Sequence, residues 1–168
     1  MNPNDLTRLT LREASDALRA GKTTSVELTS ACLDRIATVD PVLNSFITVT
    51  GDSAMQQAEA LDAEFRAGHY RGPLHGIPIA LKDLIDTKGV RTTAGSAVYE
   101  KRIPDQDATG VRKLDDAGAV ILGKTNLHEF AYGGSGVISH WGPVHNPWDK
   151  TRTTGGSSSG SAAAVAAG

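Results

Sequence analysis

The most distinctive stretch of this chain reads Gly155-Gly156-Ser157-Ser158-Ser159-Gly160-Ser161, and it continues into the alanine-rich residues 162–167. Glycine and serine alone are typical of a flexible linker. The alanines that follow favour a helix, which a linker does not need. A glycine-rich loop that opens a helix directs backbone N–H groups and hydroxyls toward one point, which suits an anion, a carbonyl oxygen or a developing oxyanion. This stretch therefore leaves a linker, an ordinary helix cap and an active-site loop all open.

The composition narrows the class of protein. With 168 residues the chain is long enough for one domain with a sizeable core, although only 39% of the residues are hydrophobic. The formal net charge is -2 and no run of lysine or arginine occurs, so we expect no nucleic-acid or anionic-membrane partner. No signal-peptide pattern and no apolar run of membrane-spanning length occurs, so we expect a cytoplasmic protein. The single Cys32 lies among apolar residues at helical spacing and is expected to be a small buried side chain.

Residues 1–70 are expected to form a helical N-terminal region that acts as scaffold. Thr10 with Glu13, and Thr24 with Glu27, have the spacing of capping boxes, which start helices. No set of ionisable groups with a catalytic spacing stands out here. The pattern predicts one helix that stops at Gly21, a second that runs to Asp40-Pro41, a strand over residues 46–49 and a third helix from Ser53 to Gly68.

The sequence becomes more apolar after Gly72-Pro73. The run Leu74-His75-Gly76-Ile77-Pro78-Ile79-Ala80-Leu81 is apolar with β-branched residues, which predicts a strand, and Lys82 follows it directly. A lysine at the end of such a strand usually marks only the point where the chain meets water. Alternatively, apolar surroundings would desolvate the ammonium and lower its pKa from about 10.4, so that a neutral amine could act as a base.

A further helix and strand complete the pattern. Residues 107–118 predict a helix and residues 119–122 a buried strand, which together indicate a layered α/β domain. Lys124 comes next and is a rival candidate for the base, but we expect it in a turn rather than on an apolar strand. His128-Glu129 is expected on a solvated helix face, because no further metal ligands stand at a suitable spacing.

Three segments together closely resemble the amidase signature family, in the right order and spacing over nearly the whole chain. They are Gly76-Ile77-Pro78-Ile79-Ala80-Leu81-Lys82-Asp83, then Gly123-Lys124-Thr125-Asn126 through Phe130-Ala131, then Asn146-Pro147-Trp148-Asp149 followed by residues 155–164. The resemblance implies an α/β fold in which helices flank a mixed β-sheet. Residues 1–168 would be a single domain that is the N-terminal part of an amidase signature domain, with residues 71–168 forming the start of the signature core, so the fold is incomplete in this chain.

The resemblance also implies a Ser–cis-Ser–Lys triad, with Lys82 as base and acid and Ser157 as the bridging serine after a cis peptide bond. A working pair needs Lys82 Nζ within about 2.6–3.2 Å of Ser157 Oγ, and Lys82 largely out of solvent. The backbone of Ala131, Tyr132, Gly133 and Gly134 would line the acyl site. The family uses neither a metal nor an organic cofactor.

The departures from the family are informative. The family's nucleophilic serine lies beyond the position of Gly168, so residues 1–168 carry the base and the relay without the nucleophile.

The implied function is hydrolysis of a small-molecule carboxylic amide through an acyl-enzyme. We expect no direct nucleic-acid contact and no membrane partner, and the resemblance leaves open whether the protein forms a homodimer. The alternatives are a glutaminase subunit of a tRNA-dependent amidotransferase, which has protein partners, and a non-catalytic binding fragment. That subunit typically reads Asp-Glu-Phe-Ala-Met-Gly-Ser-Ser where this chain has residues 128–135, and it usually has Gly-Gly after the paired serines, where Ser159-Gly160 stands here. Both differences favour a stand-alone amidase.

Overall fold

The computed structural model describes residues 3–168, with the side chains described from residue 5 onward. No helix among these residues is both long and apolar enough to span a bilayer. The elements in chain order are α1 (Pro3–Leu6), α2 (Leu11–Arg19), α3 (Ser25–Leu43), β1 (Phe46–Val49), α4 (Gly51–Arg66), β2 (Pro78–Lys82), η1 (Ala97–Tyr99), α5 (Thr109–Asp116), β3 (Val120–Thr125), η2 (Glu129–Ala131) and α6 (Ser159–Ala167).

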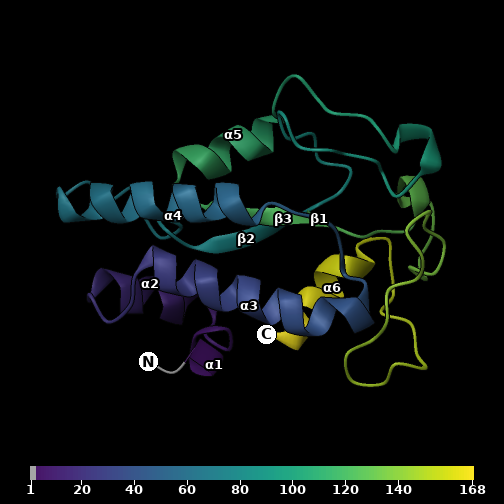
Figure 1. Ribbon diagram of the computed structural model, residues 1–168, viewed down its shortest axis with the longest axis horizontal. Coiled ribbons are helices and arrows are strands. Elements are labelled where there is room, and N and C mark those ends of the chain that lie inside the picture. Colours follow the sequence, from purple (N-terminus) through teal and green to yellow (C-terminus); the bar gives the residue numbers. More distant parts are fainter. Residues whose placement is uncertain (1–2) are drawn as a thin grey trace.

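A small mixed sheet lies between layers of helices, which confirms the predicted α/β class. Its strand order is β1-β3-β2, with β1 antiparallel and β2 parallel to β3. Helix α5 covers one face, and α3 and α6 cover the other (Figure 1). Helix α4 lies along the edge of β3 where β1 ends, because Thr50 N donates to Leu122 O and Ile121 N donates to Gln57 Oε1.

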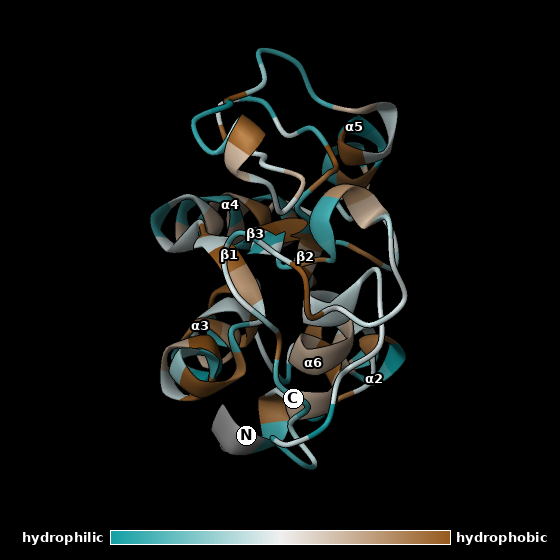
Figure 2. Cartoon of the chain, turned by 90° about the vertical axis from the view of Figure 1, so that its right-hand side faces the viewer, coloured by the Kyte–Doolittle hydropathy of each residue, from teal (hydrophilic) through white to brown (hydrophobic). Residues whose placement is uncertain are grey.

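The core follows from the alternation of side chains along the strands. Leu81 and Ile121 pack with Val111 of α5, while Val120 and Leu122 of β3 pack toward α3 and α4. Hydrophobic residues accordingly concentrate where the helices meet the sheet, and the outer loop above α5 is hydrophilic (Figure 2).

The N-terminal helices begin where the sequence predicts. Both capping boxes are formed: the side chains of Thr10 and Thr24 accept from the N–H of Glu13 and Glu27, and each glutamate accepts in return. The predicted end of the second helix at Asp40-Pro41 is wrong, because α3 continues through Pro41 to Leu43. Proline at position 41 removes the one helix bond that its N–H would make, and only two helical residues follow it.

Strand β3 is longer than predicted and contains an irregularity at Gly123. Ile79 pairs with Ile121 but Leu81 pairs with Lys124, so β3 holds one extra residue between these pairs. Gly123 has φ 151°, and a Cβ on it would lie 2.2 Å from Thr48 O. A bulge of this kind exchanges the faces to which the following side chains point. The expectation that Lys124 lies in a turn is therefore wrong: Lys124 is a strand residue.

This constraint can be tested by adding a methyl group. Gly123→Ala places Cβ against a backbone oxygen of β1 at a φ that alanine rarely adopts, and we expect the free energy of unfolding to fall by about 2 kcal/mol or more. Gly110→Ala, in α5 with nothing within 4 Å of its Cβ, is the matched control and should change stability by no more than about 1 kcal/mol, in the stabilising direction. Urea unfolding of both variants measures the difference, and equal stabilities would contradict this account.

Candidate active site

Lys82 and Ser157 lie in hydrogen-bond contact. Lys82 is the last residue of β2, Ser157 lies just before α6, and Lys82 Nζ donates to Ser157 Oγ at 2.6 Å across 75 sequence positions. The Gly156–Ser157 peptide bond is cis. Both geometric predictions are therefore confirmed.

The pairing of the strands directs Lys82 toward α6. Lys82 pairs with Thr125, and paired residues of neighbouring strands point to the same face. Thr125 Oγ1 lies 2.8 Å from Ser161 Oγ, so this face carries the first turn of α6. Gly160 lets the helix approach, because a Cβ there would lie 2.2 Å from Ser45 O. The strand and the loop before α6 thus bring the amine and the hydroxyl together.

The second glycine-rich loop lies against the first. A Cβ on Gly156 would lie 3.0 Å from Gly133 O and 3.1 Å from the carbonyl carbon of Gly134, and His128 N donates to Ser157 O at 3.0 Å. Of the four residues expected to line the acyl site, Gly133 and Gly134 therefore lie beside the Ser157 loop.

The other two residues of that set are Ala131, the last residue of η2, and Tyr132, which follows it. Ala131 N donates to His128 O and Tyr132 N donates to Glu129 O. Tyr132 is 91% exposed, so its ring makes little contact with the rest of the described chain.

Burial lowers the pKa of Lys82 below its ordinary value. Its side chain is half-buried rather than largely out of solvent, so the expectation about its burial is met only in part. Among the residues that the structure describes, no carboxylate lies within 4.0 Å of Lys82 Nζ. Desolvation without a counter-ion favours the neutral amine, which is the form that accepts a proton.

The sequence did not identify Lys124 as a buried group. Its side chain is 0% exposed, and its Nζ donates to Ile85 O at 2.6 Å and to Thr92 Oγ1 at 2.7 Å. Burial lowers the pKa of Lys124 to about 8, against the opposing effect of Asp83. An isolated glycine inside a strand pattern is a signal for a bulge, and Gly123 could have extended the predicted strand to Lys124.

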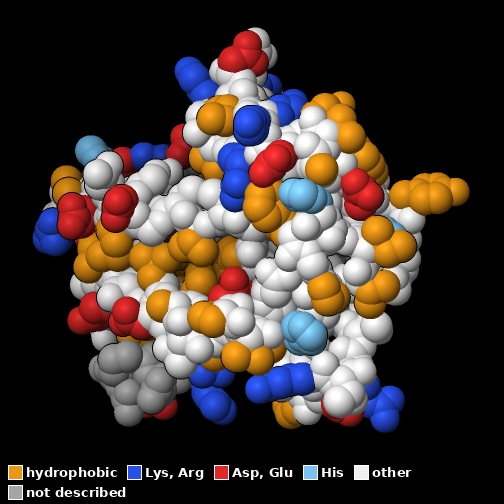
Figure 3. All heavy atoms as spheres, turned by 45° about the vertical axis from the view of Figure 1, so that its right-hand side comes forward, with side chains coloured by type: hydrophobic (Ala, Val, Ile, Leu, Met, Phe, Trp, Pro, Cys, Tyr) orange, Lys and Arg blue, Asp and Glu red, His pale blue; other side chains and the backbone are white. Residues whose placement is uncertain are grey.

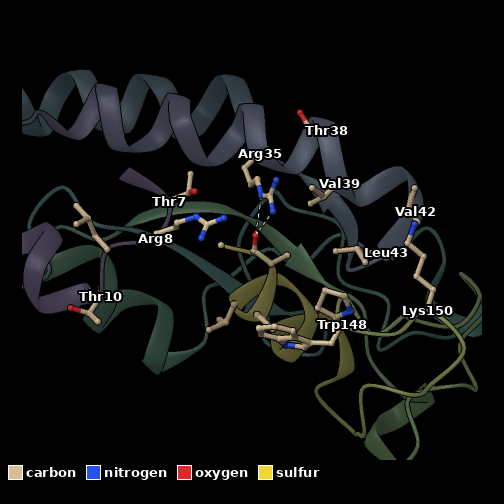
Figure 4. A pocket seen from close by; sticks show the side chains of 16 residues that line it. Thr7, Arg8, Thr10, Arg35, Thr38, Val39, Val42, Leu43, Trp148 and Lys150 are labelled. Atoms are coloured by element: carbon tan, nitrogen blue, oxygen red, sulfur yellow. Dashed lines mark hydrogen bonds between the residues drawn. The ribbon is translucent and has the colours of Figure 1, made fainter. Parts of the chain in front are cut away.

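A hollow of about 920 Å³ lies away from this pair, between the α1–α2 connection, α3 and α6. Figure 4 shows Arg35 directed at the end of α6, where its guanidinium donates to Ala167 O at 2.9 and 2.7 Å. Neither Lys82 nor Ser157 lines this hollow, so we assign it no part in the chemistry.

The loop-rich end around the pair is partly apolar. Figure 3 turns this end forward and shows hydrophobic side chains scattered among polar and backbone atoms. Exposed hydrophobic side chains in the segments 98–103 and 130–138 are Val98, Tyr99, Ile103, Phe130, Tyr132, Val137 and Ile138.

No cluster of three or more histidine, cysteine or acidic residues within residues 3–168 could hold a metal ion.

The lowered pKa of Lys82 can be measured directly. We expect its amine, followed by NMR of the chain labelled at the lysine side chains and assigned with Lys82→Arg, to titrate below about 10.4. Because burial causes the shift, Ser157→Ala should leave the pKa low. A Lys82 amine that titrates at about 10.4 or above in the unaltered chain would contradict this account.

The chain is similar over nearly its whole length to named amidotransferase subunits and to solved amidases. The chain is 52% identical over 164 residues to a glutamyl-tRNA(Gln) amidotransferase subunit of Acidothermus cellulolyticus, covering 98% of this chain and 32% of that protein. It is 54% identical over 158 residues to the corresponding subunit of Halorhodospira halophila, covering 94% and 32%. The native peptide amidase of Stenotrophomonas maltophilia superposes with a TM-score of 0.86 at 44% identity, covering 93% of this chain and 33% of that one. The chain thus spans about a third of the length of these relatives.

One kind of relative is named an amidotransferase subunit and the other a peptide amidase, so together they support amide chemistry in general and leave hydrolase or amidotransferase open. The structural similarity confirms the amidase signature fold, of which this chain covers a part. The protein-family model Amidase matches residues 27–168. The chain therefore belongs to the amidase family.

Proposed function

We propose that residues 1–168 are the N-terminal part of a single amidase domain and supply the base and the relay of an enzyme that hydrolyses carboxylic amides. The observation that carries this proposal is the 2.6 Å contact between Lys82 Nζ and Ser157 Oγ. A desolvated amine held against a hydroxyl has the form of a proton relay.

The relay suits an amide substrate, because an amide nitrogen leaves only when it is protonated. Neutral Lys82 takes the proton of Ser157 Oγ while Ser157 takes the proton of the nucleophilic serine, whose oxygen bonds to the carbonyl carbon as the C=O π pair moves onto the carbonyl oxygen. Lys82 then returns its proton to Ser157, and Ser157 gives its own proton to the nitrogen as the C=O bond re-forms and the C–N bond breaks. Water attacks the acyl-enzyme through the same relay, and the nucleophilic serine regains its proton as the acid leaves. The backbone of Ala131 to Gly134 would line the acyl group, and the nucleophile belongs to the part of the family domain beyond residue 168.

A second candidate is the glutaminase subunit of a tRNA-dependent amidotransferase. It is favoured by the identity of about half with the amidotransferase relative from A. cellulolyticus over nearly the whole chain. Against it stand the residues at 128–135 and Ser159-Gly160, which differ from the usual pattern of that glutaminase. Hydrolysis of glutamine that requires partner subunits would favour this candidate over the stand-alone hydrolase.

Activity can be tested in a chimera that joins residues 1–168 to the remaining two thirds of the S. maltophilia peptide amidase. We expect the chimera to hydrolyse peptide amides, and Lys82→Met or Ser157→Ala to lower kcat/KM by about 10³-fold or more, because each breaks the relay. Residues 1–168 alone should give no turnover, since they lack the family's nucleophile.

The matched control is Lys113→Met, an exposed lysine on α5, which should leave kcat/KM unchanged. An active chimera that keeps its rate after Lys82→Met would reject the proposal. Turnover by residues 1–168 alone that is lost on Lys82→Ala would reject the assignment of the nucleophile to the domain beyond residue 168.

A further inference from the structure

A second lysine lies beneath the first, on the opposite face of the sheet. Lys124 pairs with Leu81 and therefore points toward the α5 face, whereas Lys82 points toward α6. Its ammonium meets Ile85 O, Thr92 Oγ1 and, at 3.8 Å, Asp83 Oδ1. With no exposed surface, this amine cannot reach a substrate.

Asp83 ties the end of β2 to its surroundings. Its N–H donates to Thr125 O at 3.0 Å, its carbonyl accepts from Ala94 N at 2.8 Å, and its Oδ2 accepts from Thr93 N at 2.9 Å. Its Oδ1 is buried and has no hydrogen-bond partner within residues 3–168. Lys124 is the cation that forms an ion pair with this carboxylate, and Arg91 adds a weaker attraction.

The two lysines are connected through one short turn. Ile85 N donates to Lys82 O at 3.0 Å, and Ile85 O accepts from Lys124 Nζ. Lys124 thus holds Ile85, which closes the turn that follows Lys82. It also pairs with Asp83, the residue directly after Lys82.

The neighbouring cations are engaged elsewhere. Arg91 lies over the ring of Trp141 at 4.5 Å and donates to Ile47 O. Arg102 donates to both carboxylate oxygens of Asp86. Neither contacts Ile85 O, so Lys124 alone among these cations fixes the turn.

We propose that Lys124 is a positioning residue: by holding Ile85 O and Asp83 from the far face of the sheet, it keeps the Lys82 amine at Ser157. The inference deepens the proposed function, since it concerns the same base. Stability alone is a weak reason for such a pair, because a buried ion pair can often be replaced by apolar residues without loss.

The test separates positioning from stability with two variants of residues 1–168. Lys124→Met removes the ammonium and leaves Asp83 as an uncompensated buried carboxylate, so we expect lower stability. The double variant Lys124→Met with Asp83→Asn removes both charges and should regain stability. The readout is the NMR cross-peak between the Lys82 side-chain Hε and Ser157 Hβ, with Lys113→Met as the control.

We expect the cross-peak in the unaltered chain and in Lys113→Met, and its loss in both Lys124 variants, including the restabilised double variant. A cross-peak that returns with stability in the double variant would overturn the proposal, because a purely structural role predicts that return. Absence of the cross-peak from the unaltered chain would also overturn the proposal. The proposed function would be rejected by a different result, which is a chimera that keeps its kcat/KM after Lys82→Met.

Discussion

The absence of a side chain at Gly123 keeps Lys124 off the face of the sheet on which Lys82 meets Ser157. A Cβ on Gly123 would lie 2.2 Å from Thr48 O, so only glycine fits at this point, where β3 holds one extra residue. That residue directs Lys124 to the α5 face and leaves Lys82 and Thr125 facing α6. The first turn of α6, the loop before it and the Lys82 amine can meet only on that face.

The two lysines show how surroundings assign different roles to one residue type. Lys124 has the larger pKa shift, to about 8, yet it is enclosed, has two hydrogen-bond acceptors and faces a carboxylate. Lys82 has the smaller shift, but it is half-buried, has no carboxylate within 4.0 Å among the described residues and contacts the Ser157 hydroxyl. A base needs access to its proton donor as well as a lowered pKa, so we propose Lys82 rather than Lys124 as the base.

Local signals predicted much of the fold, and the family resemblance predicted the central contact of the site. The capping boxes at Thr10 and Thr24 and the strand Phe46–Val49 depend on near neighbours, which a sequence displays. The placement of Lys124 was missed because it depends on the approach of Gly123 to β1, a strand distant in the chain. The end of α3 was missed because Pro41 removes only one helix bond and the helix continues past it for two residues.

The central claim is that Lys82 and Ser157 act as one relay, and a double-mutant cycle on kcat/KM in the chimera tests it most directly. Groups that act as a unit are strongly non-additive, because removing either one already breaks the path of the proton. The account predicts that Lys82→Met combined with Ser157→Ala is no slower than the slower single variant. Losses that multiply in the double variant would contradict it, because they would show two groups that contribute independently.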